Sequence, residues 1–161
     1  MGDAPTKLRP YRVSDFETLY RIDQLCYPPS IAYDRIDMAY YLGAPGVFCV
    51  VAEVTGTPAG FIITHRKRTV GHIITIDVLE DYRRMHIGTE LLVAAEKDAL
   101  SHGVNRMDLE TATTNNAAIA LWKKHGYREV GTIKDYFGPG LHAYEMQKNL
   151  SSPAKSQAPR P

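Results

Sequence analysis

The sequence predicts a single α/β domain with a mixed central sheet of about six to seven strands, flanked by about four helices. Strand-like runs dominate the first half of the chain, and strand and helix patterns alternate in the second half. The 161 residues suit one domain with a sizeable core. Charged residues make up 23% and apolar residues 44%, which is ordinary for a globular protein.

Polar residues and prolines divide the first half into its expected elements. The stretch Val13-Ser14-Asp15 offers capping groups for a helix that runs to about Leu25, where a Tyr-Pro-Pro-Ser sequence breaks it. Asp34 is expected to cap a second helix that ends near Gly43. The expected strands in this half are Leu8–Arg12, Val47–Val54, Ala59–Arg66 and His72–Val78.

The second half alternates helices and strands. A helix is expected from Ile87 to about His102, and another from Asn116 to His125, closed by Gly126. The apolar face of the longer helix consists of Leu91, Leu92, Ala95 and Ala99. The expected strands here are Met107–Ala112, Tyr127–Thr132 and His142–Lys148.

The domain is expected to span residues 7–150. Residues 1–6 are expected to form a flexible N-terminus, and residues 151–161, rich in Pro, Ser, Ala and Lys, a disordered tail. Two cysteines cannot build a disulfide framework of the secreted kind. No apolar stretch could span a bilayer and no signal peptide is visible, so we expect a cytoplasmic protein.

The composition also limits the expected partners. A net charge of +1 gives no reason to expect nucleic acid or an anionic membrane. The six histidines lack ligand-like spacing to cysteines or carboxylates, so no metal site is expected.

The loop Arg83–Thr89 is the most informative segment, because it leads from a strand into the longer helix. Unpaired N–H groups and the positive end of a helix dipole favour a phosphate or pyrophosphate there. Arg83 and Arg84 add charge and bidentate donors. An ordinary turn with a solvated basic pair is the alternative.

This segment resembles the acyl-CoA loop of the GNAT acetyltransferase superfamily, Gln/Arg-x-x-Gly-x-Gly/Ala after a strand. Here it reads Arg83-Arg84-Met85-His86-Ile87-Gly88, with His86 replacing the first glycine. A glycine there permits a positive φ, which costs another residue roughly 1–2 kcal/mol, so either the loop is adjusted or His86 points outward. A second GNAT signature is matched by Asn115, Ala118, Ile119, Leu121, Trp122, Gly126 and Tyr127.

The resemblance implies acetyl transfer from acetyl-CoA to an amine. It implies that the 83–89 backbone holds the pyrophosphate, that the backbone of 76–78 pairs with the pantetheine arm, and that Asn115 hydrogen-bonds the cofactor. Asn115 could equally cap a helix, or do both. The implied cofactor-binding residues are Ile76, Asp77, Val78, Arg83, Arg84, Met85, His86, Ile87, Gly88, Thr89, Asn115, Ala118 and Trp122.

Glu110 is the first candidate for the catalytic base. It stands twelve residues before Trp122, and ribosomal-protein alanine acetyltransferases carry a base Glu and an acid Tyr at these two places. Strand alternation puts Glu110 on the face opposite Leu109. His72 matches a catalytic Tyr of some eukaryotic protein N-terminal acetyltransferases and can accept a proton near neutral pH. Asp77 is a third candidate, and solvated side chains are the alternative for Glu110 and His72.

The family's acid is missing, because Trp122 has only an indole N–H. We expect Trp122 to pack against the cofactor arm or the core. A thiol has a pKa near 8.5, so a thiolate can leave with modest help. Tyr136 is an alternative donor, since the family often has a Tyr-Tyr or Asn-Tyr pair there.

The overall pattern is most similar to protein N-terminal acetyltransferases. Tyr27 and Pro28, with Tyr33, resemble their aromatic-proline loop at the entrance for a peptide N-terminus, although a Pro-Pro turn with aromatic packing would look the same. Tyr136 is also expected to contact substrate. An α-amine with a pKa near 7.8 is roughly 10% free at pH 7, whereas a lysine is far below 1% free.

Three functions are therefore expected to compete. The first is acetylation of a protein or peptide N-terminus by direct attack with a general base. The second is acetylation of a small amine, and the third is acyl-CoA binding without turnover. We expect a monomer or a homodimer.

Overall fold

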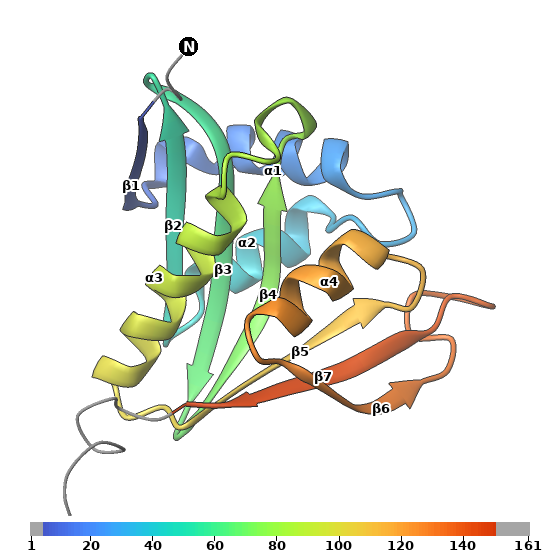
Figure 1. The fold of residues 1–161 in the computed structure, drawn as a ribbon. Helices are drawn as coiled ribbons and strands as arrows, with labels where there is room; N and C mark the ends of the chain where they lie inside the picture. Colours follow the sequence, from blue (N-terminus) through green and yellow to red (C-terminus); the bar gives the residue numbers. More distant parts are fainter. Residues whose placement is uncertain (1–4, 151–161) are drawn as a thin grey trace, which may run out of the picture.

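The computed structural model describes residues 5–150, in which helices cover both faces of one seven-stranded sheet (Figure 1). The strand order is β1-β2-β3-β4-β5-β7-β6, and only β4 and β5 are parallel neighbours. The elements are β1 (Thr6–Pro10), η1 (Val13–Asp15), α1 (Phe16–Cys26), α2 (Arg35–Gly43), β2 (Val47–Val54), β3 (Thr57–Lys67), β4 (Val70–Val78), η2 (Glu80–Tyr82), α3 (Ile87–Ser101), β5 (Arg106–Ala112), α4 (Asn116–Lys124), β6 (Arg128–Ile133) and β7 (Ala143–Asn149).

The pairing of β4 with β5 is short. Val70–His72 lies in parallel register with Arg106–Asp108, and no further pairs follow along these strands. β5 instead pairs along its whole length with β7. The two strands therefore diverge after His72, with α4 in front of the gap in Figure 1.

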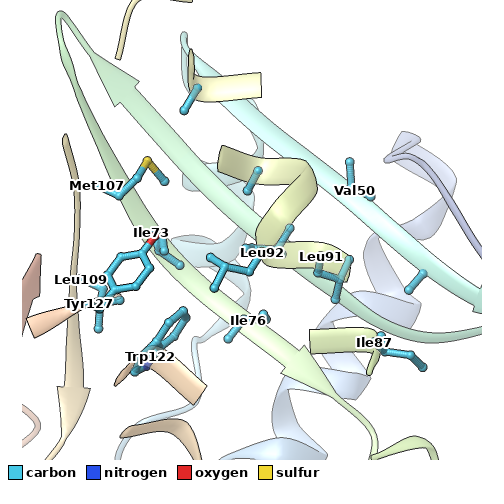
Figure 2. Close-up of a cluster of buried hydrophobic side chains, with 14 of the residues drawn as sticks. Val50, Ile73, Ile76, Ile87, Leu91, Leu92, Met107, Leu109, Trp122 and Tyr127 are labelled. Carbon is cyan, nitrogen blue, oxygen red and sulfur yellow. The ribbon is translucent and has the colours of Figure 1, made fainter. Parts of the chain in front are cut away.

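The face of α3 predicted to be apolar holds this helix on the sheet (Figure 2). Leu91, Leu92, Ala95 and Ala99 are all buried, as predicted, in a cluster that includes Ile76 of β4. Burying a leucine side chain contributes about 1.5–3 kcal/mol, so packing rather than helix propensity dominates the stability of α3.

The opposite face of the sheet carries α1 and α2. Their buried side chains form a second cluster with β2 and β3, made of Leu19, Ile22, Met38, Val51, Phe61 and Ile63. The predicted cap of α2 is confirmed, because the Asp34 carboxylate accepts the Asp37 N–H at 2.8 Å. A cap of this kind contributes about 1 kcal/mol.

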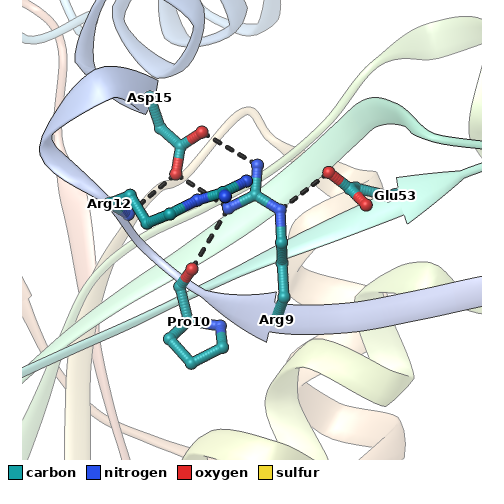
Figure 3. Close-up of polar contacts among 5 residues, drawn as sticks. All are labelled: Arg9, Pro10, Arg12, Asp15 and Glu53. Carbon is teal, nitrogen blue, oxygen red and sulfur yellow. Dashed lines mark hydrogen bonds and ion pairs between the residues drawn. The ribbon is translucent and has the colours of Figure 1, made fainter.

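Asp15, within the predicted capping stretch 13–15, is the N-cap residue of α1, but its carboxylate makes no capping hydrogen bond to that helix because Arg9 engages it (Figure 3). The two terminal nitrogens of Arg9 donate to Asp15 at 2.8 Å, and Nε donates to Glu53 at 2.7 Å. The Arg12 N–H also donates to Asp15 at 2.8 Å. Arg9, Asp15 and Glu53, here called the Arg9 cluster, tie β1 to β2 and to η1.

Most predicted boundaries lie within two residues of the observed ones. β1 begins two residues before the predicted Leu8, and β6 begins at Arg128 because Tyr127 turns into the core. Gly126 closes α4 as predicted, with a φ of 89° and hydrogen bonds from its own N–H and that of Tyr127 back to α4. The predicted disordered tail (151–161) and residues 1–4 of the predicted flexible N-terminus lie outside the described residues.

Candidate active site

Two adjoining cavities open where β4 and β5 diverge. The loop cavity, about 400 Å³, lies between the end of β4, the 83–89 loop and α4. The central cavity, about 70 Å³, lies between β4, β5 and the segment after α1. The two cavities share the lining residues Tyr27, Ile76, Asn115 and Ala118, so one leads into the other.

Most of the predicted cofactor-binding residues surround the loop cavity. Met85 packs against the core instead, and Trp122 lines only the central cavity. The predicted residues that line the loop cavity are Ile76, Val78, Arg83, Arg84, His86, Ile87, Gly88, Thr89, Asn115 and Ala118.

The 83–89 loop has two residues in the left-handed backbone region. Arg84 has a φ of 70° and His86 a φ of 62°. His86 therefore keeps the positive φ of the glycine that it replaces, at a cost of roughly 1–2 kcal/mol. At Gly88 an added Cβ would lie 3.5 Å from Leu121, an ordinary contact, so the space beside this glycine is open.

Side chains already cover the carbonyl groups along the β4 edge at the cavities. The Tyr33 hydroxyl donates to the Ile74 carbonyl at 3.2 Å, and the Tyr27 hydroxyl donates to that of Ile76 at 2.8 Å. The Val78 carbonyl accepts from Arg83 Nε at 2.9 Å and from the Cys26 thiol at 3.4 Å. Any backbone pairing of a ligand with this edge must share or displace these donors.

Asp77 does not point into either cavity. Its backbone lies opposite Phe61 of β3, and its carboxyl group is buried on the α1 side, where Thr75 donates to it at 2.6 Å. Among the described residues, one oxygen of Asp77 and one of the equally buried Asp23 have no hydrogen-bond donor. Burial and the adjacent Asp23 raise the pKa of Asp77 well above its usual range, which favours the protonated form of Asp77. The second Asp23 oxygen accepts the Tyr33 N–H at 2.7 Å.

The three predicted catalytic residues meet at the Glu110 carboxylate, which lines the central cavity. His72 Nε2 lies 3.0 Å from Glu110 Oε1, and the Tyr136 hydroxyl donates to the same oxygen at 3.1 Å. Glu110 faces away from the buried Leu109, as strand alternation predicts. His72 does not line this cavity; it lies behind Glu110 and borders an outer groove of about 560 Å³.

Asp108 contacts the other ring nitrogen of His72, Nδ1. His72, Asp108 and Glu110 are called the His72 cluster here. Burial alone would lower the pKa of His72, but the hydrogen bonds that its ring donates to both carboxylates outweigh burial and raise the pKa to about 9. The ring is therefore an imidazolium at neutral pH. Burial and the Glu110 charge raise the pKa of Tyr136 to about 12, so its hydroxyl stays protonated.

Trp122 and Asn115 have structural roles, and Pro28 lies outside both cavities. Trp122 is 4% exposed and packs edge-to-face on Tyr127 with ring centroids 5.6 Å apart; its indole N–H has no partner in the described part of the chain. Asn115 caps α4, since its side chain accepts the Ala118 N–H at 3.1 Å. Pro28 is exposed at the turn after α1 and lines neither cavity.

Sequence reasoning missed Asp108 and Asp23. Asp108 had a visible signal, because it precedes Glu110 by two residues and so shares its face of the strand. Asp23 had none, since its contact with Asp77 joins distant parts of the chain.

Comparison with known proteins places this chain in a family. The sequence model of the acetyltransferase (GNAT) family matches residues 16–127. The chain therefore belongs to that family, and it is an acetyl-CoA-dependent acetyltransferase. The resemblance predicted from the two motifs is confirmed.

One relative is similar in sequence over nearly the whole chain, and two solved structures have the same fold. The chain is 31% identical over 157 residues to the N-alpha-acetyltransferase of Sulfurisphaera tokodaii, covering 89% of this chain and 93% of the relative. Two solved structures share the fold at 22% identity. The ribosomal-protein-S18-alanine N-acetyltransferase of Escherichia coli has a TM-score of 0.83, with 96% of this chain and 99% of that one covered. Arabidopsis thaliana Naa50, in complex with the bisubstrate analogue CoA-Ac-MVNAL, has 0.79, with 90% and 99% covered.

No helix within residues 5–150 is long and apolar enough to cross a membrane. The same range contains no group of three or more His, Cys, Asp or Glu side chains arranged to hold a metal ion.

Proposed function

We propose that this chain transfers the acetyl group of acetyl-CoA to the α-amine of a peptide or protein N-terminus, with Glu110 as the general base. The observation that carries the proposal is the Glu110 carboxylate at the edge of the central cavity, which is hydrogen-bonded by His72 and Tyr136. The 31% identity to an N-alpha-acetyltransferase supports the choice of amine.

The loop cavity fits the expected acetyl-CoA. Its size, the open space at Gly88 and the two arginines suit a ligand with a pyrophosphate, whose oxygens the N–H groups at the start of α3 would bind. The edge groups of Ile76 and Val78 would accompany the pantetheine arm toward the central cavity. Asp77 is left out of this set, because neither its backbone nor its carboxyl group faces the cavities.

Acetyl-CoA supplies a thioester whose carbonyl carbon the amine nitrogen attacks. As the new C–N bond forms, the nitrogen becomes acidic, and Glu110 takes one of its protons. His72 is already protonated at neutral pH and does not line the central cavity, which makes Glu110 the better acceptor. The Tyr136 hydroxyl and the His72 ring hold the carboxylate in one orientation.

The carbon–sulfur bond then breaks and the sulfur departs as a thiolate. Because a thiol has a pKa near 8.5, this departure needs little help from a side-chain acid. Trp122 lines the central cavity with its ring packed on Tyr127, and we assign it packing rather than proton donation. Tyr136, with a pKa of about 12, serves as a hydrogen-bond donor.

The peptide N-terminus would enter past Tyr27, Tyr33 and Tyr136, which line the central cavity. Burial raises the pKa of Tyr27 and Tyr33, so both hydroxyls stay neutral donors. Pro28 would shape the turn without touching the substrate. A cytoplasmic location and a monomeric or homodimeric state stay predictions.

The test is release of the CoA thiol from acetyl-CoA in the presence of peptides, lysine-containing peptides with blocked N-termini, and small amines. Turnover only with free peptide N-termini is the expected result. Turnover only with small amines would assign the chain to small-amine acetylation, and binding of acetyl-CoA without turnover would reduce it to an acyl-CoA-binding module.

Two variants of Gly88 test the cofactor part of the proposal. Gly88→Trp should abolish acetyl-CoA binding by filling the loop cavity, whereas Gly88→Ala should retain it, since a Cβ fits there. Unchanged acetyl-CoA affinity of Gly88→Trp by calorimetry would contradict this assignment.

A further inference from the structure

Two carboxylates flank His72, and only one of them reaches the central cavity. Asp108 and Glu110 are two residues apart on the same face of β5, and Asp108 is the parallel-register partner of His72. Asp108 contacts Nδ1 of the ring, and Glu110 lies 3.0 Å from Nε2. Asp108 lines the outer groove, on the far side of the ring from the proposed reaction.

We propose that Asp108 is a positioning residue that fixes the His72 ring so that its Nε2–H is directed at Glu110. The inference rests on the proposed role of Glu110 as base. An imidazole ring alone can flip or rotate, and its proton can occupy either nitrogen. A carboxylate that accepts the Nδ1–H removes that freedom, as outer partners orient the histidine ligands of metals. In the imidazolium, the second proton is then directed from Nε2 at Glu110.

The surroundings of His72 favour a protonated ring. The charged groups of β5 around it are Asp108, Glu110 and Arg106, which lies 3.9 Å from Asp108. Tyr136, from the segment between β6 and β7, reaches the same Glu110 oxygen. On the β3 side, the outer groove is also lined by His65, Lys67 and Arg68. The two carboxylates touch the ring directly, and their effect dominates that of these more distant cations, in keeping with a His72 pKa of about 9.

The test is Asp108→Asn, which keeps the shape of the side chain and removes its charge. We expect the His72 pKa, measured by NMR titration of the ring, to fall by about one pH unit or more, since a close opposite charge shifts a pKa by 1–3 units. The upper pH limb of kcat should move down by the same amount, while the KM for acetyl-CoA stays unchanged.

The test has a matched control variant, Asp98→Asn, and a variant that preserves the charge, Asp108→Glu. Asp98→Asn removes the carboxylate from the Asp98–His102 pair of α3, 3.5 Å apart and outside both cavities, and should move neither the His72 pKa nor kcat. Asp108→Glu keeps the charge and should keep the His72 pKa high. It also keeps the inference testable if Asp108→Asn fails to fold.

An unchanged His72 pKa in Asp108→Asn would overturn the inference, and so would a loss of kcat that is equal at every pH. The NMR titration needs no turnover, so it decides the coupling of Asp108 to His72 even for a protein that acetylates nothing. A wild type without turnover on any peptide would overturn the proposed function instead.

Discussion

The Arg9 cluster and the His72 cluster have the same plan, since in each a cationic side chain lies between two carboxylates. In the Arg9 cluster the side chains are 10–17% exposed and far from both cavities. In the His72 cluster they are 19–33% exposed, and one carboxylate lines the central cavity. The two clusters share this arrangement of charges, but only the His72 cluster has a carboxylate that a substrate in the central cavity could reach.

The cations differ in a second way. A guanidinium never loses its proton in a protein, and the two carboxylates of its cluster raise the pKa of Arg9 further. An imidazolium with a pKa of about 9 can exchange its proton in the range where enzymes work. The same arrangement of charges therefore forms a fixed tie at the edge of the sheet, and in the proposed mechanism it surrounds the base where the sheet splits.

The largest effect is expected from removing one carboxylate of each cluster in parallel. Glu110→Gln should lower kcat about 100- to 10,000-fold, the usual contribution of a general base, with little change in acetyl-CoA affinity. Glu53→Gln should leave kcat unchanged and lower the free energy of unfolding instead. Steady-state kinetics measure kcat, calorimetry measures the acetyl-CoA affinity, and urea denaturation measures the free energy of unfolding. Full activity of Glu110→Gln together with inactive His72→Ala would move the role of base to His72.

Arg9→Met tests the structural side of the comparison. It leaves two largely buried carboxylates without a cation, which costs about 3 kcal/mol of unfolding free energy at pH 7. Turnover of the folded protein should persist. A urea curve that matches the wild type would contradict the structural role of Arg9.

An acid titration sharpens this prediction. Hydrogen bonds from Arg9 lower the pKa of Asp15, so the stability that this pair contributes is present above the unfolded pKa of about 3.9. It is lost as the pH falls through the lower, folded pKa. The stability of Arg9→Met should change less with pH in that acid range than the stability of the wild type.

If proton handling by the His72 cluster suffices, Trp122 need not donate a proton. Trp122→Phe should keep turnover and cost about 1 kcal/mol of stability from lost packing, offset in part by removal of an unpartnered N–H. Trp122→Tyr should also stay active. A large loss of kcat in Trp122→Phe, with an intact circular dichroism spectrum, would make the indole N–H functional.

The smallest effect at neutral pH is expected from the Asp23–Asp77 pair, which has two carboxyl groups and no cation between them. The pKa of Asp77 is raised on folding, so its contribution to stability is full below its unfolded pKa of about 3.9 and is lost as the pH rises through the folded pKa. Asp77→Asn should remove this loss at alkaline pH, because an amide can donate to Asp23 at every pH. Unfolding free energies of the wild type and Asp77→Asn at pH 6 and pH 9 test this prediction. An equal change between the two pH values in both proteins would contradict the raised pKa of Asp77.

Local patterns were sufficient for most of the fold. The Val47–Val54 strand was predicted to the residue because a glycine-containing turn bounds a valine-rich apolar run, and the face of α3 followed from helical spacing. Asp15 begins α1 within the predicted capping stretch, but its carboxylate makes no capping hydrogen bond to the helix and accepts instead from Arg9. Its partner Glu53 comes from another strand, and no local rule anticipates that contact.

The site was predictable in part, again from local patterns. Strand alternation placed Glu110 on the open face, and the motif resemblance supplied His72 and Tyr136. That His72 and Tyr136 contact the same Glu110 oxygen depends on the splitting of β4 from β5, which only the three-dimensional register reveals. The burial of Asp77 likewise depends on which face of β4 receives α1.

The most direct test of the account is the position of the acetyl group on a peptide that carries both a free α-amine and one lysine. After incubation with acetyl-CoA, fragment-ion mass spectrometry should locate a single acetyl group on the α-amine. Glu110→Gln should give almost no product under the same conditions. Acetyl groups on the lysine alone, or equal yields from the wild type and Glu110→Gln, would contradict the central claim.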